Sequence, residues 1–265
     1  MKTYQERETL IPEAGVSIEM ERFYQIRENH VLVLAKGFGG CSGRNYLVDE
    51  LAKDYNVVTF SPRNSGNSNG HLTVDNFISD FKQVIDRVAQ ERATAPYAIG
   101  HSLAAYSLAR ILEEKPAVRK GVLLAPLINM SEQNPSFVNH YLERCVKKGE
   151  LKVPSVLVSV IAKNQRFEGD DLLAFAQSTC NASEVTVSLQ SPTYAILAGR
   201  GNVSRMRIRN LDKLKQKWES LGAKVDICEK SNHWFSGYGF SGSEGEFQIM
   251  EREGLLSKVK DFLIE

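Results

Sequence analysis

Short apolar runs, four to six residues long and rich in Val, Ile and Leu, recur along this chain of 265 residues. They cover residues 31–35, 56–60, 97–100, 121–126, 194–199 and 224–229. Runs of this kind are typical of strands buried on both faces of a parallel sheet. The segments between them are typical of helices, as the spacing of Phe77, Phe81 and Val84 illustrates. The sequence therefore predicts an α/β fold with a mostly parallel central sheet flanked by helices.

Two segments depart from this alternation of strands and helices. Residues 3–11 and 15–24 predict an antiparallel hairpin at the edge of the sheet. Residues 129–190 have a different character, beginning with a polar stretch at Asn129. We expect these residues to form an inserted cap, or lid, on a core made of residues 1–128 and 191–265.

The charge of the chain is nearly balanced, with 33 Lys and Arg against 32 Asp and Glu. This balance argues against nucleic acid or an anionic membrane as the main partner and favours small-molecule chemistry or protein contacts. No apolar stretch is long enough to span a bilayer, and the first residues lack the apolar core of a signal peptide. We therefore expect a cytoplasmic protein without stable membrane insertion.

The four cysteines, Cys41, Cys145, Cys180 and Cys228, do not have the spacing of metal ligands. In a chain of this size they do not indicate a disulfide scaffold either. We expect free thiols, no metal and no organic cofactor.

The pentapeptide Gly-His-Ser-Leu-Ala at residues 100–104 lies between a predicted strand and a predicted helix. A strand that turns sharply into a helix with Ser102 at the apex would hold the hydroxyl out of the sheet, beside amides at a helix N-terminus. This strand–turn–helix around Ser102, here called the elbow, is how a serine nucleophile is presented. The usual last glycine of the pattern is replaced by Ala104, which is still small enough for close packing of strand and helix.

Two backbone amides are candidates for stabilising a negative charge beside Ser102. The strand at residues 31–35 leads into a glycine-rich turn, Lys36-Gly37-Phe38-Gly39-Gly40. Next to a nucleophile, this turn would offer the Phe38 amide to an oxyanion, with the Leu103 amide as the second donor.

His233 is the candidate general base, because it is the one histidine of the chain that follows a late strand in a predicted loop. The residue that orients it is expected after the strand at residues 194–199, where the sequence supplies Asn202. An amide oxygen can fix the histidine tautomer but does not stabilise an imidazolium as a carboxylate does. A carboxylate from Glu229, Asp226 or Glu132 is the open alternative.

With these residues in view, the chain resembles the α/β-hydrolase superfamily, within it the serine aminopeptidase-like and monoacylglycerol-lipase-like branch. The resemblance extends to residues 43–46, to Asp80, and to residues 60–70, which resemble an Asp-x-Arg-Gly-x-Gly-x-Ser turn. It implies an α/β-hydrolase fold with Ser102 as nucleophile and His233 as base. The departures from the family pattern are Lys36 for the usual His, Ser61 and Asn64 in the Arg-Gly turn, Ala104 in the elbow, and Asn202 in the acid position.

These residues predict a serine hydrolase, esterase-like or thioesterase-like, that acts on a small-molecule acyl substrate through an acyl-enzyme on Ser102. Two alternatives remain open. The chain could be a catalytically impaired hydrolase-fold binding protein whose acid position has become Asn202, or an acyltransferase that uses the same serine and histidine.

Overall fold

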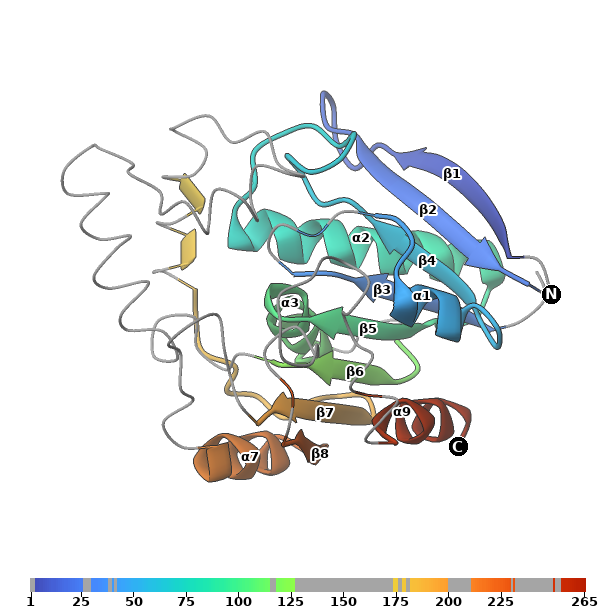
Figure 1. The fold of residues 1–265 in the computed structure, drawn as a ribbon. Coiled ribbons are helices and arrows are strands. Elements are labelled where there is room, and N and C mark those ends of the chain that lie inside the picture. Colours follow the sequence, from blue (N-terminus) through green and yellow to red (C-terminus); the bar gives the residue numbers. More distant parts are fainter. Residues whose placement is uncertain are drawn as a thin grey trace.

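The computed structural model describes residues 3–25, 30–37, 40, 42–114, 118–126, 174–175, 178–179, 182–199, 211–229, 231, 250 and 254–265. Within this part of the chain, eight strands form one sheet in the order β1-β2-β4-β3-β5-β6-β7-β8 (Figure 1). The strands are β1 (Tyr4–Leu10), β2 (Ile18–Tyr24), β3 (Val31–Ala35), β4 (Asn56–Phe60), β5 (Tyr97–His101), β6 (Gly121–Leu124), β7 (Thr193–Ala198) and β8 (Ala223–Cys228). Strands β3 to β8 run parallel, whereas β1 and β2 are antiparallel to their neighbours. The predicted α/β fold with a mostly parallel sheet is confirmed.

Helices cover both faces of this sheet (Figure 1). The described helices are α1 (Tyr46–Leu51), α2 (Val74–Arg92), α3 (Leu103–Leu112), α7 (Leu211–Ser220) and α9 (Leu255–Ile264). Side chains of α2, α3 and α7 share one buried cluster with Val33, and side chains of α1 and α9 share another with Leu32 and Leu34. Successive strand residues point to opposite faces, so a strand covered on both sides is apolar at most of its positions. Strands β3 and β6 are unbroken apolar runs for this reason, whereas β4 also contains Asn56 and Thr59.

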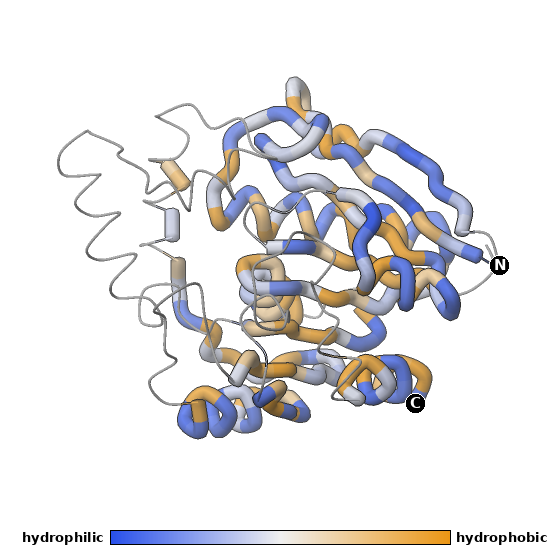
Figure 2. The backbone as a smooth tube through the Cα atoms, in the orientation of Figure 1, coloured by the Kyte–Doolittle hydropathy of each residue, from blue (hydrophilic) through white to orange (hydrophobic). Residues whose placement is uncertain are grey.

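The outer hairpin differs from the inner strands in composition. Strands β1 and β2 pair from Tyr4 opposite Tyr24 to Leu10 opposite Ile18, which confirms the predicted edge hairpin. Strand β1 is mostly exposed and mostly hydrophilic, as its colour in Figure 2 shows. An edge strand rich in charged side chains resists pairing with another chain.

Side-chain caps begin two of the helices. The Asn45 Oδ1 accepts a hydrogen bond from the Val48 N–H of α1 at 2.9 Å, and the Thr73 Oγ1 accepts one from the Asn76 N–H of α2 at 3.1 Å. Such caps each contribute about 1 kcal/mol to helix stability. Helix α1 was not anticipated from the sequence, because a helix of six residues is too short to show a clear apolar period.

The end of the expected cap segment lies against the core where the structure describes it. Val185 is fully buried and Phe175 nearly so, and both belong to the cluster that α2 and α3 share. The Tyr106 hydroxyl donates to the Ser183 carbonyl at 2.6 Å, and the Gln190 N–H donates to the Leu112 carbonyl at 2.8 Å. The earlier part of the expected cap, residues 129–173, lies outside the described residues.

In the part of the chain that the structure describes, no helix is both long enough and apolar enough to cross a membrane.

Candidate active site

Ser102 sits at the junction between β5 and α3, with a backbone conformation of φ 58° and ψ −119°. A non-glycine residue avoids this region of φ and ψ at a cost of about 1–3 kcal/mol, so the surrounding structure must impose it. The Ser102 N–H donates to the Leu124 carbonyl of β6 at 2.9 Å. Its carbonyl accepts hydrogen bonds from the Ala105 and Tyr106 N–H groups of α3 at 3.0 and 3.1 Å. The residue is thus bonded to the sheet on one side and to the helix on the other.

Gly100 explains why the chain can turn so sharply. A Cβ atom at this position would lie 2.3 Å from the Ala104 carbonyl oxygen and 2.8 Å from the Ala105 Cα, which is far inside van der Waals contact. Ala104 and Ala105 are themselves fully buried. The small residues on both sides of Ser102 therefore allow the first turn of α3 to lie directly against the end of β5.

The turn after β3 lies against this elbow. A Cβ atom on Gly37 would be 2.7 Å from the Ser102 Cβ and 3.1 Å from the Leu103 nitrogen. Leu103 is the first residue of α3, so its N–H has no carbonyl partner within the helix. The structure thus brings together the glycine turn, Ser102 and the Leu103 amide. Phe38, the other expected oxyanion donor, lies outside the described residues.

Hydrogen bonds join the described residues on the two sides of the turn after β3. The Gly40 N–H donates to the Gly37 carbonyl at 2.8 Å, and the Lys36 Nζ donates to the Gly43 carbonyl at 3.1 Å. The Gly43 N–H donates to the Thr59 Oγ1 of β4 at 3.3 Å. The side chain of Lys36, which replaces the family's usual histidine, therefore links the start of this turn to Gly43.

His233 and Asn202, the expected base and its orienting partner, both lie outside the described residues, as does Glu132. The strand ends that lead to them are close together. A Cβ atom on Gly199 would be 2.6 Å from the Glu229 Cα, so the chain leaves β7 and β8 at adjacent points. Glu229 is exposed at this edge.

Asp226, another candidate for orienting His233, has partners of its own within the fold. Its Oδ2 accepts hydrogen bonds from the Tyr194 hydroxyl at 2.6 Å and from the Lys258 Nζ at 2.8 Å. Burial would raise the pKa of Asp226, but the bonds from Lys258 and Tyr194 outweigh it and hold the pKa below its usual value. The carboxylate connects β7, β8 and α9, which gives it a structural role.

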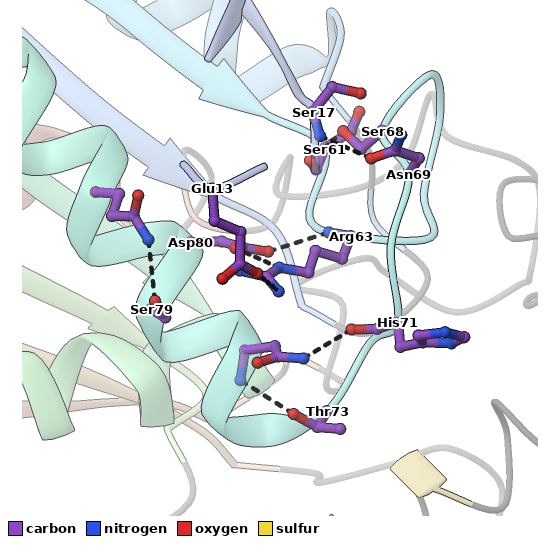
Figure 3. A network of polar contacts seen from close by, with 12 residues as sticks. Glu13, Ser17, Ser61, Arg63, Ser68, Asn69, His71, Thr73, Ser79 and Asp80 are labelled. Carbon is purple, nitrogen blue, oxygen red and sulfur yellow. Dashed lines mark hydrogen bonds and ion pairs between the residues drawn. The ribbon is translucent and has the colours of Figure 1, made fainter. Parts of the chain in front are cut away.

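Asp80, which the family resemblance singles out, is the partner of Arg63 (Figure 3). The Arg63 Nε donates to the Asp80 Oδ1 at 2.9 Å, and the Arg63 N–H donates to the Oδ2 at 3.2 Å. The Arg63 Nη1 also donates to the Glu13 Oε1 at 2.6 Å. Burial would lower the pKa of Arg63, but the bonds to Asp80 and Glu13 raise it, so the guanidinium stays charged. The pair fastens the turn after β4 to α2.

Two further features bear on ligands. An open pocket of about 340 Å³ lies between the start of α2 and the middle of α3. Its lining includes Thr73, Ile78, Tyr106 and Arg110. Ser102 is not among its lining residues. In the described part of the chain, no group of three His, Cys, Asp or Glu side chains is arranged to hold a metal ion.

The family model for serine aminopeptidase, S33, matches residues 27–185, which is more than half of the chain. The chain belongs to this family. It is therefore a hydrolase of the α/β-hydrolase superfamily, and the suspected resemblance is confirmed. Among curated proteins, no significant match is found.

Solved structures share the fold at low sequence identity. An esterase from Pyrococcus furiosus is 16% identical with a TM-score of 0.63, covering 98% of this chain and 92% of that one. An enol-lactonase from Burkholderia xenovorans is 13% identical with a TM-score of 0.62, covering 95% and 98%. The thioesterase domain of a curacin biosynthetic pathway is 16% identical with a TM-score of 0.57, covering 99% and 100%. At these identities the likeness establishes the fold alone.

Proposed function

We propose that this hydrolase cleaves esters or thioesters through an acyl-enzyme formed on Ser102. The backbone of Ser102 carries the proposal, because φ 58° at a serine between a strand and a helix is a strained conformation that the packing of a stable core would not need. The esterase, lactonase and thioesterase among the structural neighbours support acyl chemistry.

In the proposed reaction, the Ser102 Oγ attacks the acyl carbonyl carbon while His233 removes the hydroxyl proton. The carbonyl oxygen becomes an oxyanion that accepts hydrogen bonds from the Leu103 and Phe38 amides. When the bond to the leaving group breaks, His233 returns the proton to the departing alcohol or thiol. Water, activated by the same histidine, then releases the acid and regenerates the serine.

Asn202 has the role of orienting His233 in this scheme, and it bears on the alternatives. An amide in this position favours a histidine of fixed tautomer but a less stabilised imidazolium. A chain with such a site could bind an acyl compound and turn it over slowly, or pass the acyl group to an acceptor other than water.

A fluorophosphonate probe tests the nucleophile directly, since an activated serine hydroxyl attacks phosphorus as it does a carbonyl. Wild-type protein should be labelled once, at Ser102, and Ser102→Ala should not be labelled. Ser220→Ala, at an exposed serine of α7, is the matched control and should be labelled like wild type. A wild-type protein that stays unlabelled would favour the binding-protein alternative.

The orienting residue is tested by Asn202→Asp, which is nearly isosteric and adds a negative charge. Ester turnover should rise, because the added charge stabilises the imidazolium in the transition state. If turnover is unchanged or lower, and Glu229→Gln abolishes it, the orienting carboxylate comes from Glu229 and not from position 202.

A further inference from the structure

Glu19 of β2 accepts hydrogen bonds from two separate loops. Its Oε2 accepts from the Ser42 hydroxyl at 3.1 Å, in the loop after β3, and from the Ser61 hydroxyl at 3.0 Å, in the turn after β4. Its Oε1 accepts from the Asn67 side-chain amide at 2.5 Å. One carboxylate thus forms hydrogen bonds with both the loop after β3 and the turn after β4.

A further hydrogen bond joins the two serines directly. The Ser42 N–H donates to the Ser61 Oγ at 2.9 Å, so the loop is bonded through its backbone as well as its side chain. Gly66, at φ 55°, completes the packing, because a Cβ there would lie 2.6 Å from the Ser61 Oγ and 2.8 Å from the Glu19 Oε2. The turn therefore closes tightly over the carboxylate.

Glu19 is suited to this task because it remains ionised. It is half-buried, and burial alone would raise its pKa. The hydrogen bonds from Asn67, Ser61 and Ser42 outweigh burial and hold the pKa of Glu19 below its usual value. Hydrogen bonds to an ionised acceptor are about twice as strong as those between neutral groups.

The bonded loop leads directly to the elbow. Ser42 is joined to Gly43, whose carbonyl accepts from the Lys36 Nζ, and the Gly40 N–H is bonded to the Gly37 carbonyl. Gly37 then lies against Ser102: a Cβ atom added to Gly37 would be 2.7 Å from the Ser102 Cβ. A shift of the loop at Ser42 would therefore be transmitted to the backbone beside Ser102.

We propose that Glu19 is a positioning residue for the active site: through Ser42 and Ser61 it holds the described part of the turn after β3, above all Gly37, against Ser102 and the Leu103 amide. The inference rests on the proposed function. Glu19 acts through these serines and has no contact with the substrate in this role. An oxyanion donor acts in the transition state more than in the ground state, so its displacement lowers kcat and leaves KM little changed.

The test is Glu19→Gln, which keeps the shape of the side chain and removes its charge. Turnover of an aryl ester, the rate of fluorophosphonate labelling and the free energy of unfolding are measured together. Loss of a whole oxyanion donor costs about 100-fold to 1,000-fold in kcat. For a loosened loop we expect kcat and the labelling rate to fall about tenfold, with KM within about twofold of wild type.

The matched control is Asn69→Ala in the same turn. The Asn69 Oδ1 accepts a hydrogen bond from the Ser17 N–H, just before β2, at 2.6 Å (Figure 3). This variant should lower stability without lowering kcat, which separates loop positioning from general loosening of the turn. Ser61→Ala should lower kcat in wild type but add little in the Glu19→Gln background, since both act through one network.

Equal kcat and labelling rates for wild type and folded Glu19→Gln would overturn the inference alone. If Glu19→Gln does not fold, Ser42→Ala removes the contact at its far end, and wild-type kcat in that variant would overturn it. A wild-type protein with neither labelling nor turnover would overturn the proposed function, and the inference with it.

Discussion

The turns after β4 and β5 lie on either side of β3, and each contains a non-glycine residue with positive φ. Asn64 has φ 60° in the first turn, and Ser102 has φ 58° in the second. The first turn is held by charged and polar side chains, above all Arg63, Asp80 and Glu19. The second is held by backbone hydrogen bonds and by the absence of side chains at Gly37 and Gly100.

The difference shows two physical ways of imposing an unfavourable backbone conformation. The turn after β4 depends on charge, since its partners come from α2, β2 and the hairpin loop. The elbow depends on volume, since any added atom at Gly100 meets the backbone of α3. The first should therefore be the more sensitive to removal of a charge, although Gly66 leaves no room for a Cβ there either, and the second to addition of a methyl group.

The largest effect is expected for Arg63→Met. The Asp80 side chain is fully buried and that of Arg63 only 8% exposed, so the variant leaves a buried carboxylate without its cation. Removing one partner of such a pair costs about 3–5 kcal/mol of unfolding free energy. Urea denaturation measures it. The double variant Arg63→Met, Asp80→Asn should regain part of the loss, and a single-variant loss below about 1 kcal/mol would mean that charge does not hold this turn.

Gly100→Ala should have the next largest effect on stability, about 1–3 kcal/mol, because the backbone of α3 has to move to admit the methyl group. Fluorophosphonate labelling should fall sharply with it, since Ser102 moves too. Gly121→Ala on β6 is the control: its Cβ would meet only the flexible end of Leu112 at 2.6 Å. If both variants lose the same stability and both keep labelling, the elbow does not depend on volume.

The smallest effects separate the two positive φ residues themselves. Ser102→Gly should raise the unfolding free energy by about 1 kcal/mol, because relief of backbone strain exceeds the entropy cost of glycine. Asn64→Gly should change it by only a few tenths of a kcal/mol, since Asn tolerates the left-handed region. Denaturation of both variants in parallel measures the difference, and equal changes would contradict the assignment of strain to Ser102.

The sequence predicted most of what depends on short stretches of chain. The six parallel strands, the edge hairpin and the main helices follow from apolar periods, and their ends differ from the observed ones by a residue or two, as at β7 (Thr193–Ala198). The sharp turn at Ser102 was also predictable, because a strand, small residues and a helix follow one another directly. The roles of His233, Asn202 and Phe38 remain predictions.

Other parts of the candidate site could not be read from the sequence. Glu19 and its partners Ser61 and Asn67 are separated by 42 and 48 residues, and nothing in the local pattern of β2 marks Glu19 as different from Glu21. Asp226, an open alternative for orienting His233, is a second example: the sequence does not reveal that Tyr194 and Lys258 both donate to its Oδ2.

By itself, the sequence determined where strands and helices form and where the chain turns, because periodicity and the sizes of adjacent side chains act over a few residues. The tertiary structure decided which charged groups meet. The order of strands brings β2 beside β4, and this places Glu19 between the loop after β3 and the turn after β4. Hydrogen bonds of this kind depend on distances of about 3 Å between segments far apart in the chain, which no local pattern encodes.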